Sequence, residues 1–260
     1  LGVNEFQWEV YNGSCANSLT SDIVTIVLFD AQAPAADAGA DQELCAPDDT
    51  AIITGNDPVG AAVGTWTLAG GTGVIADPAS PSTTVTGLTI GENIFRWTIT
   101  SGVCVTTEDE VSIFVFDPMN ADANAGLDQE LCVPQDSVFM AGSALIFPTT
   151  GTWTTLAGTG VPVNPNDPGT MISTLAIGLN TFQWEVYNGP CANGLTSDLV
   201  NVILYDDTTA AAMAGPDLES CLPITTVTME GVMPPAPAEG TWTVIAGNGV
   251  FADIHDPTTS

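Results

Sequence analysis

The sequence predicts an all-β protein built from tandem antiparallel β-sandwiches. One segment recurs at residues 1–15, 90–104 and 177–191, each copy reading Gly-x-Asn-x-Phe-x-Trp and ending in Gly-x-Cys. Trp8, Trp97 and Trp184 lie 89 and 87 residues apart, and a fixed period of this size indicates an array of about three modules. Alternating apolar residues between frequent Gly and Pro favour short strands and turns over helices.

The N-terminal piece, residues 1–33, is predicted to be the C-terminal half of one module. Phe6, Trp8 and Val10 alternate with more polar residues, the pattern of a half-buried strand. The Asn-Gly pair at 12–13 favours a tight hairpin turn, because that turn needs positive φ angles. A second strand is expected over residues 22–30.

The first complete module is predicted to span residues 34–119. Strands are expected at residues 41–45, 51–54, 64–68, 82–88, 95–99 and 111–115. About seven short strands with a turn every 8–12 residues are typical of an antiparallel sandwich. Residues 120–208 repeat this order as a second complete module. The strand Gly-Thr-Trp-Thr at 64–67 recurs at 151–154 and 240–243, so residues 209–260 are predicted to be the N-terminal half of another module, ending after its third strand.

The charge balance excludes several classes of partner. Thirty-one acidic residues stand against one basic residue, Arg96, giving a formal net charge of −30. Nucleic acids and anionic membrane surfaces need a cationic protein face, so we expect neither as a partner. The longest apolar run, around residues 23–29, has the length of a strand, so we predict no membrane insertion in this segment. Trypsin has one site, after Arg96, and we expect the chain to resist it.

The cysteines indicate an oxidised, extracellular protein. Cys45 and Cys132 each follow a predicted first strand, and Cys104 and Cys191 each follow a predicted hairpin turn. The separation within each module is 59 residues, so we predict the disulfides Cys45–Cys104 and Cys132–Cys191, one per module. A large distance between Cys45 and Cys104 would overturn this pairing.

Cys15 and Cys221 have no partner under this scheme. We expect their partners outside the printed residues, which would make this sequence a piece of a longer array. In an alternative arrangement, residues 1–30 of one chain complete residues 215–260 of another, and Cys221 pairs with the other chain's Cys15.

The repeated motifs resemble a known group of sequences. Ala123-Asn-Ala-Gly-Leu-Asp-Gln-Glu-Leu-Cys132 is followed by Gly-Thr-Trp-Thr, then Gly-x-Asn-x-Phe-x-Trp, then Asn-Gly-x-Cys. This order resembles the PKD-like, immunoglobulin-like repeats of Bacteroidota secreted surface proteins, adhesins and gliding-associated proteins exported by type IX secretion. The resemblance implies an immunoglobulin-like sandwich in an extracellular, cell-surface appendage, without one particular activity. Unlike antibody domains, the predicted disulfides tie the first strand to the last hairpin.

Carboxylates cluster at the three predicted module junctions, where calcium would join neighbouring modules, since Ca²⁺ prefers six to eight oxygen ligands. The candidate ligands are Asp30, Asp37 and Asp41, then Asp117, Asp122 and Asp128, then Asp206, Asp207 and Asp217. No EF-hand sequence is present, so solvated acidic loops are the alternative. No other cofactor is predicted.

The resemblance also implies O-glycosylation at an Asp-Ser/Thr-apolar sequon. Thr50 and Ser137 occupy equivalent positions in such sequons. The same residues are common in ordinary turns, which is the alternative.

The tryptophans are interpreted as core rather than as a carbohydrate-binding platform, because each module has two at fixed strand positions. They are Trp66, Trp97, Trp153, Trp184 and Trp242. His255 is the single histidine, and Asn166 occupies its place in the second module, so no repeated catalytic triad can form. We predict that the protein is not an enzyme.

The sequence therefore predicts a structural segment of a long extracellular fibre, stalk or filament with a mechanical or adhesive role. Its partners would be neighbouring modules of the same chain, with lateral self-association into a filament as a further expectation. The alternative is an adhesin whose sandwich-end loops capture sugar or protein on other cells. Residues 51–58 and 138–147, which differ in length and polarity, would then form part of the binding surface.

Overall fold

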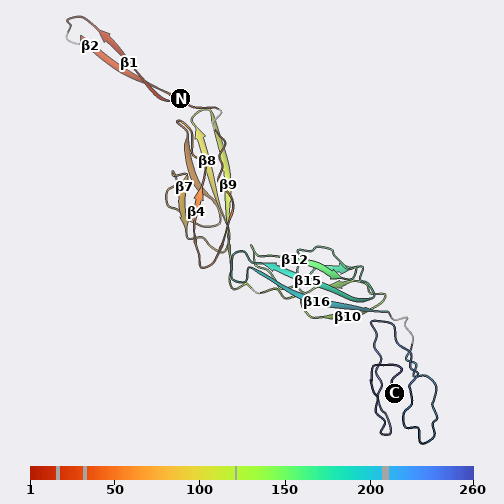
Figure 1. Ribbon diagram of the computed structural model, residues 1–260. Coiled ribbons are helices and arrows are strands. Elements are labelled where there is room, and N and C mark those ends of the chain that lie inside the picture. The colour runs from red at the N-terminus through yellow and green to blue at the C-terminus, as the bar shows by residue number, and fades with distance from the viewer. Residues whose placement is uncertain (16–17, 32–33, 121, 207–210) are drawn as a thin grey trace. The chain divides into compact units, whose positions relative to one another are not determined.

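The computed structural model describes residues 1–15, 18–31, 34–120, 122–206 and 211–260 (Figure 1). The described residues form sixteen β-strands, which confirms the all-β prediction. No helix among them is long and apolar enough to cross a membrane. Contacts divide the chain into two compact units. Unit 1 comprises Leu1–Asn120 with the loops Ile146–Thr149 and Asn188–Gly194; unit 2 comprises Ala121–Leu145, Thr150–Tyr187 and Leu195–Ser260.

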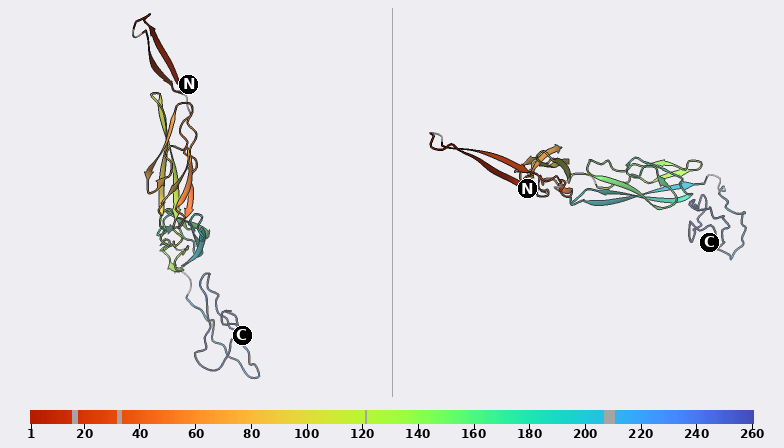
Figure 2. Two further views of the ribbon diagram at one scale, coloured as in Figure 1. Left: turned by 90° about the vertical axis from the view of Figure 1, so that its left-hand side faces the viewer. Right: turned by 90° about the horizontal axis from the view of Figure 1, so that it is seen from above.

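The N-terminal strands β1 (Gly2–Tyr11) and β2 (Leu19–Leu28) form a two-stranded antiparallel sheet (Figure 2). The predicted hairpin is confirmed. The amide of Asn12 donates to Ser18 O at 2.7 Å and closes the turn. Every residue of β2 is exposed, as are Phe6, Trp8 and Val10 on β1.

The first sandwich lies within unit 1 and consists of seven strands. They are β3 (Gln42–Cys45), β4 (Thr50–Thr54), β5 (Val63–Gly70), β6 (Val74–Ile75), β7 (Ser82–Thr86), β8 (Gly91–Ser101) and β9 (Val105–Phe116). One sheet has the order β3-β9-β8-β5 and the other β4-β7-β6. The six predicted strands are present, and the short β6 is additional. One pairing differs from a purely antiparallel arrangement, because β3 runs parallel to β9.

The core of the first sandwich forms around two indole rings. Trp66 on β5 and Trp97 on β8 have ring centroids 4.9 Å apart, and both rings are buried with Phe95 and Ile53. Each indole N–H donates to a backbone carbonyl, that of Trp66 to Pro81 O and that of Trp97 to Asn56 O. Both rings are buried and both indole N–H groups are hydrogen-bonded, which supports the interpretation of these tryptophans as core residues.

The second sandwich repeats this plan. Its strands are β10 (Gln129–Cys132), β11 (Val138–Phe139), β12 (Thr150–Ala157), β13 (Val161–Pro162), β14 (Met171–Ser173), β15 (Gly178–Tyr187) and β16 (Leu195–Tyr205). The sheet orders are β10-β16-β15-β12 and β11-β14-β13, again with a parallel first strand. Trp153 and Trp184 lie 5.0 Å apart in its core.

A buried asparagine explains the third residue of the Gly-x-Asn motif. Asn93 is completely buried at the start of β8; its side chain accepts from the Thr72 amide and donates to Thr89 O. Asn180 is equally buried and likewise donates to the Ala176 and Val202 carbonyls. These amides satisfy backbone groups of the neighbouring loop that burial would otherwise leave unpaired.

The C-terminal residues 211–260 contain no strand among those described, so the strand predicted at 240–243 is absent. The physical reason is the missing partner. In the second sandwich the equivalent strand β12 pairs with β15, and among the described residues no strand pairs with residues 240–243. The loop contacts nevertheless persist: Trp242 N donates to Ile254 O as Trp153 N donates to Pro165 O, each at 2.8 Å.

Candidate functional site

The candidate functional site is a joint within unit 1 that connects the end of β9 to two loops of the second sequence repeat. We define the joint as Cys45, Phe114–Asn120, Ile146–Thr149 and Asn188–Gly194. All of these residues belong to unit 1. Two parts of the sequence form the joint. Strand β9 ends at Phe116, and the turn between β15 and β16 contains Asn188 and Gly189.

A chain of side-chain amides forms the polar part of the joint. Asn188 Nδ2 donates to Asp117 O at 2.9 Å, and Asn193 Nδ2 donates to Asn120 O at 3.0 Å. The Thr149 hydroxyl donates to Asn188 Oδ1 and accepts from Asn120 Nδ2, both at 2.6 Å. Asn120, Thr149 and Asn188 are all nearly or fully buried. Buried, mutually satisfied groups fix one geometry, because breaking any of them leaves a polar atom unpaired.

An apolar contact lies beside these hydrogen bonds. Gly189 packs against the buried Phe116 ring, and a Cβ at this position would overlap the ring. Its φ of +56° also favours glycine. Phe114 and Phe147 meet edge to face with centroids 6.2 Å apart. Glycine is therefore required here both for its conformation and for the close approach.

The same contact occurs one repeat earlier, also inside unit 1. Ser101 Oγ donates to Asp30 O at 3.0 Å, and Gly102 packs against the ring of Phe29. Ser101 stands 87 residues before Asn188, and Phe29 stands 87 residues before Phe116. The joint is therefore a repeated feature of the array.

A disulfide closes the joint covalently and corrects the predicted pairing. Cys45 bonds to Cys191, with a Cα–Cα distance of 5.1 Å and a sequence separation of 146 residues. The predicted bonds Cys45–Cys104 and Cys132–Cys191 are therefore wrong.

Strand direction explains the error. Cys45 is paired with Phe116 at the far end of β9, whereas Cys104 stands just before Val105 at the beginning of this 12-residue strand. At ~3.3 Å per residue, the two cysteines are separated by roughly 40 Å of strand, far beyond the reach of a disulfide. The first-strand cysteine therefore lies beside the hairpin of the following repeat, not beside its own.

Four cysteines are free and exposed in the structure: Cys15, Cys104, Cys132 and Cys221. Cys15 and Cys104 occupy hairpin positions equivalent to that of Cys191. Cys132 and Cys221 occupy first-strand positions equivalent to that of Cys45.

Several of the carboxylates predicted to bind calcium accept hydrogen bonds from backbone amides. Asp37, Asp41, Asp117 and Asp128 accept hydrogen bonds from the amides of Gly39, Ser112, Met119 and Asn201, respectively, at 2.8–2.9 Å. Asp30, Asp122, Asp206 and Asp217 are described, and Asp207 lies outside the described residues. Among the described residues, no three His, Cys, Asp or Glu gather in a metal-binding group. Calcium at the junctions stays a prediction.

The proposed glycosylation positions differ in exposure. Thr50 is exposed at the first position of β4, and Ser137 is half-buried just before β11. Their equivalence is confirmed by the backbone, since Asp49 O accepts from Leu88 N as Asp136 O accepts from Leu175 N. Modification of either hydroxyl stays a prediction.

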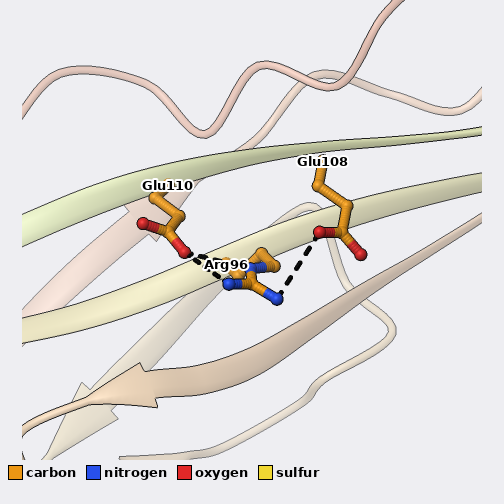
Figure 3. Close-up of polar contacts among 3 residues, drawn as sticks. All are labelled: Arg96, Glu108 and Glu110. Atoms are coloured by element: carbon orange, nitrogen blue, oxygen red, sulfur yellow. Dashed lines mark hydrogen bonds and ion pairs between the residues drawn. The ribbon is translucent and has the colours of Figure 1, made fainter.

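The basic residue Arg96 forms an exposed ion pair on the β8–β9 hairpin. Its Nε and Nη2 donate to Glu110 Oε1 at 3.0 and 2.8 Å, and Nη1 lies 3.5 Å from Glu108 (Figure 3). The hydrogen bond to Glu110, with the negative charge of both glutamates, raises the pKa of Arg96. Side chains this exposed contribute little to stability.

His255 makes a loop contact that Asn166 makes in the second sandwich. Its Nδ1 lies 3.2 Å from Gly240 O and 3.3 Å from the Thr241 hydroxyl. In the second sandwich, Asn166 Nδ2 contacts the equivalent Gly151 O and Thr152 hydroxyl at 3.0 and 3.1 Å. Histidine thus replaces asparagine in a loop contact.

Comparison with known proteins finds a family model that is similar to the first sandwich. Residues 38–115 match the family described as K319L-like, PKD domain. No curated protein matches the chain. Among solved structures, the PKD domain of the KIAA 1837 protein is 24% identical, covers 34% of this chain and 92% of that one, and has a TM-score of 0.29. The PKD domain of human KIAA0319 is 18% identical over 37% of this chain and 87% of that one, with a TM-score of 0.28.

The tandem arrays among these structures include extracellular domains 3–5 of Drosophila OTK, which are 12% identical over 72% of this chain and 67% of that one, with a TM-score of 0.33. The family match and the observed strand order together define the fold as tandem PKD-type, immunoglobulin-like sandwiches.

Sequence reasoning did not identify Asn188, Gly189 and Thr149 as joint residues. A signal was available, because Tyr-Asn-Gly at 11–13 returns unchanged at 187–189. A turn alone needs only the positive φ of Asn-Gly. The tyrosine before the turn (Tyr11 and Tyr187) and the cysteine after it (Cys15 and Cys191) also recur, which indicates that the turn has a second role.

Proposed function

We propose that this chain is a load-bearing segment of an extracellular, cell-surface fibre. The observation that carries the proposal is the Cys45–Cys191 bond, which spans 146 residues and joins the first strand of one repeat to a hairpin loop of the next. Tension entering at Cys45 passes through this bond to Cys191, so the residues between them do not bear it.

The remaining joint contacts support the same role. The buried amide chain through Thr149 and the packing of Gly189 on Phe116 hold the end of β9 against the hairpin loop. Arrays whose repeats contact only their neighbours gain stiffness from such interfaces. The joint thus combines a covalent tether with a specific non-covalent contact.

The disulfide and the composition support an extracellular location. Persistent disulfides are a feature of oxidising compartments. The resemblance of the repeats to Bacteroidota secreted surface proteins supports export by type IX secretion and an adhesive setting for the fibre. A net charge of −30 disfavours lateral contact between bare chains, so lateral bundling would require salt or divalent cations.

The adhesin alternative depends on loops that differ between the modules. The end of the longer loop in the second repeat, Ile146–Thr149, is engaged in the joint: Thr149 bonds to Asn120, and Phe147 meets Phe114. This use of the loop favours the structural function over ligand capture by the same residues.

Single-molecule pulling between residues 1 and 260 tests the proposal. With the bond intact, the 146-residue segment cannot extend. Reduction, or the variant Cys191→Ser, should lengthen the fully stretched chain by about 500 Å, at ~3.3–3.6 Å per residue. Cys104→Ser is the matched control and should leave the extension unchanged. An oxidised chain that already stretches to the reduced length would contradict a tether at this position.

A further inference from the structure

The hairpin loop of the joint, Asn188–Gly194, contains two asparagine–glycine pairs. They are Asn188-Gly189 and Asn193-Gly194. Asparagine followed by glycine is the pair most prone to deamidation in water, because a residue without a side chain lets its own backbone nitrogen reach the carbonyl carbon of the preceding side chain. The loop therefore places two chemically labile side-chain amides at the joint.

The same two amides hold the joint closed. Asn188 Nδ2 donates to Asp117 O at 2.9 Å, and Asn193 Nδ2 donates to Asn120 O at 3.0 Å. The two asparagines are also linked to each other, since Asn188 Nδ2 donates to Asn193 Oδ1 at 3.1 Å. Each of these bonds needs an N–H group, which an amide has and a carboxylate lacks.

The closed joint keeps Asn188 from reacting. This residue is 1% exposed, and its Oδ1 accepts from the Thr149 hydroxyl at 2.6 Å, so both ends of the amide are held. The backbone is held as well, because Asn188 N donates to Gly194 O at 2.7 Å and Gly189 packs against the Phe116 ring. Attack on the side chain requires the amide to leave its partners and turn toward the Gly189 nitrogen. Deamidation therefore needs the joint to open first.

The hairpin β1–β2 carries the same pair in an exposed position. Val-Tyr-Asn-Gly at residues 10–13 repeats residues 186–189, and Asn12 N closes its turn on Ser18 O at the same 2.7 Å. Asn12 is exposed, whereas Asn188 is buried. Because the local sequence and the turn are matched, Asn12 reports how fast this sequence deamidates without the protection of a joint.

We propose that Asn188 and Asn193 are deamidation sites, which the closed joint protects and which react once the joint opens. The product cannot hold the joint, so a joint that stays open loses the ability to close. The inference rests on the joint described under the proposed function and gives its open state a limited chemical lifetime.

The reaction at Asn188 uses water and needs no oxidant or reductant. The Gly189 nitrogen attacks Asn188 Cγ and forms a bond to it. The bond from Cγ to Nδ2 breaks, and Nδ2 leaves as ammonia with the proton that the Gly189 nitrogen gives up, which produces a cyclic succinimide. Water then adds to either carbonyl of this ring and leaves aspartate or isoaspartate in the chain. Asn193 reacts in the same way with the Gly194 nitrogen.

An aspartate at position 188 would face acceptors where the amide supplies donors. Asp117 O and Asn193 Oδ1 would each lie against a carboxylate oxygen with no proton between them. The site is buried, and an unpaired charge in such a site is strongly unfavourable. The net charge of −30 adds to this penalty. Isoaspartate would lengthen the loop backbone by one carbon and displace Gly189 from the Phe116 ring.

The preceding repeat shows the same contact without a labile amide. Ser101 occupies the position of Asn188 and is also followed by glycine, and its Oγ donates to Asp30 O at 3.0 Å. The variant Asn188→Ser therefore keeps a donor for Asp117 O and has no amide to lose.

The first measurement compares two deamidation rates within one chain. The oxidised 260-residue chain is incubated near neutral pH, and mass spectrometry of a chymotryptic digest follows Asn188 and Asn12. Asn188 should react roughly 100-fold more slowly than Asn12, because several hydrogen bonds must break before it can react. Cys45→Ser, which lacks the tether, should accelerate the reaction at Asn188 by about 10-fold or more. Cys104→Ser is the matched control and should leave Asn188 slow.

The second measurement asks whether a deamidated joint closes. Reduced Asn188→Asp is reoxidised with oxidised glutathione, and it should form Cys45–Cys191 roughly 10-fold more slowly than the unchanged chain, or slower. Asn12→Asp is the matched control and should close normally, as should Asn188→Ser. Far-UV circular dichroism checks that each variant is folded, so that slow closing reports the joint and not a loss of structure.

Three outcomes would overturn the proposal. They are equal deamidation rates at Asn188 and Asn12 in the oxidised chain, a rate at Asn188 that Cys45→Ser does not change, and normal closing of folded Asn188→Asp. The Cys45–Cys191 bond is mapped separately in the non-reduced digest. Its presence together with an unprotected Asn188 would leave the load-bearing tether standing while the protection fails.

Discussion

Two hairpins of nearly identical sequence, β1–β2 and β15–β16, have opposite environments. Both form complete antiparallel ladders with the same register, Trp8 opposite Asp22 and Trp184 opposite Asp198. Yet Trp8 is 74% exposed and Trp184 is completely buried. The turn and the alternation of side chains therefore determine the hairpin, and the facing strands determine whether its apolar face becomes a core.

The C-terminal segment, residues 211–260, shows the same dependence on a partner strand. It has the turns and loop contacts of a sandwich, but no strand in residues 211–260. Backbone ladders need a partner edge, and the strand equivalent to β12 obtains one from β15. Each half of a module thus carries its local geometry, and only the two together form the sheets and the core.

The largest expected effect comes from removing the indole in each hairpin. Trp184→Ala should lower the free energy of unfolding by about 3–5 kcal/mol, because it leaves a cavity beside Trp153. Trp8→Ala in the reduced, dilute monomer should change it by less than about 0.5 kcal/mol, as for other exposed positions. Urea titration followed by far-UV circular dichroism measures both. Similar losses for the two variants would mean that β1–β2 has a buried core that the structure does not show.

A smaller effect should follow from filling the glycine beside the indole. Gly151→Ala places a methyl group into the ring of Trp184 and should cost about 1–3 kcal/mol through overpacking. Gly240→Ala meets open space and should be nearly neutral in the monomer. Both variants are compared by thermal unfolding. An equal cost would show that the glycines are needed for backbone conformation rather than for clearance.

The sequence predicted the sandwiches because alternation in strands such as β8 reflects burial directly. Phe95, Trp97 and Ile99 are each almost completely buried, as their spacing indicated. The disulfide could not be predicted from equal spacing. In a periodic chain any two positions recur with the same separation, so 59 residues from Cys45 to Cys104 and 146 to Cys191 fit the repeat equally well. Only the parallel pairing of β3 with β9, which places Cys45 away from its own hairpin tip, decides between them.

Replacing the aspartate opposite each tryptophan should lower the free energy of unfolding moderately in β15–β16 and leave it unchanged in β1–β2. Asp198 Oδ2 accepts from Ala125 N at 2.8 Å and ties the start of the second repeat to β16. Asp22 Oδ1 accepts only from its neighbour Ile23 N among the bonds observed in the described residues. Asp198→Ala should therefore cost about 1–2 kcal/mol by leaving a partly buried amide unpaired. Asp22→Ala should leave the midpoint of urea unfolding unchanged, and a loss equal to that of Asp198→Ala would contradict this account.

The smallest expected effect is at Arg96, where the β8–β9 hairpin differs from the other two. Gln7 and Gln183 occupy the equivalent positions, so the sheet accepts glutamine, and Arg96→Gln should leave the unfolding midpoint unchanged at physiological salt. Because the Arg96 pKa is raised in the folded state, any contribution of its charge is fully present below the ordinary pKa of an arginine side chain and disappears only as the pH rises beyond it. The arginine stays charged throughout the neutral range, so its titration adds no pH dependence there.

Trypsin gives the sharper readout at this position. Cleavage after Arg96 requires β8 to leave the centre of its sheet, between β9 and β5, so the native chain should stay intact while the urea-unfolded chain is cut once. Arg96→Gln should resist trypsin in both states. Rapid cleavage of the native chain would show that β8 opens far more readily than its buried Phe95 and Trp97 allow.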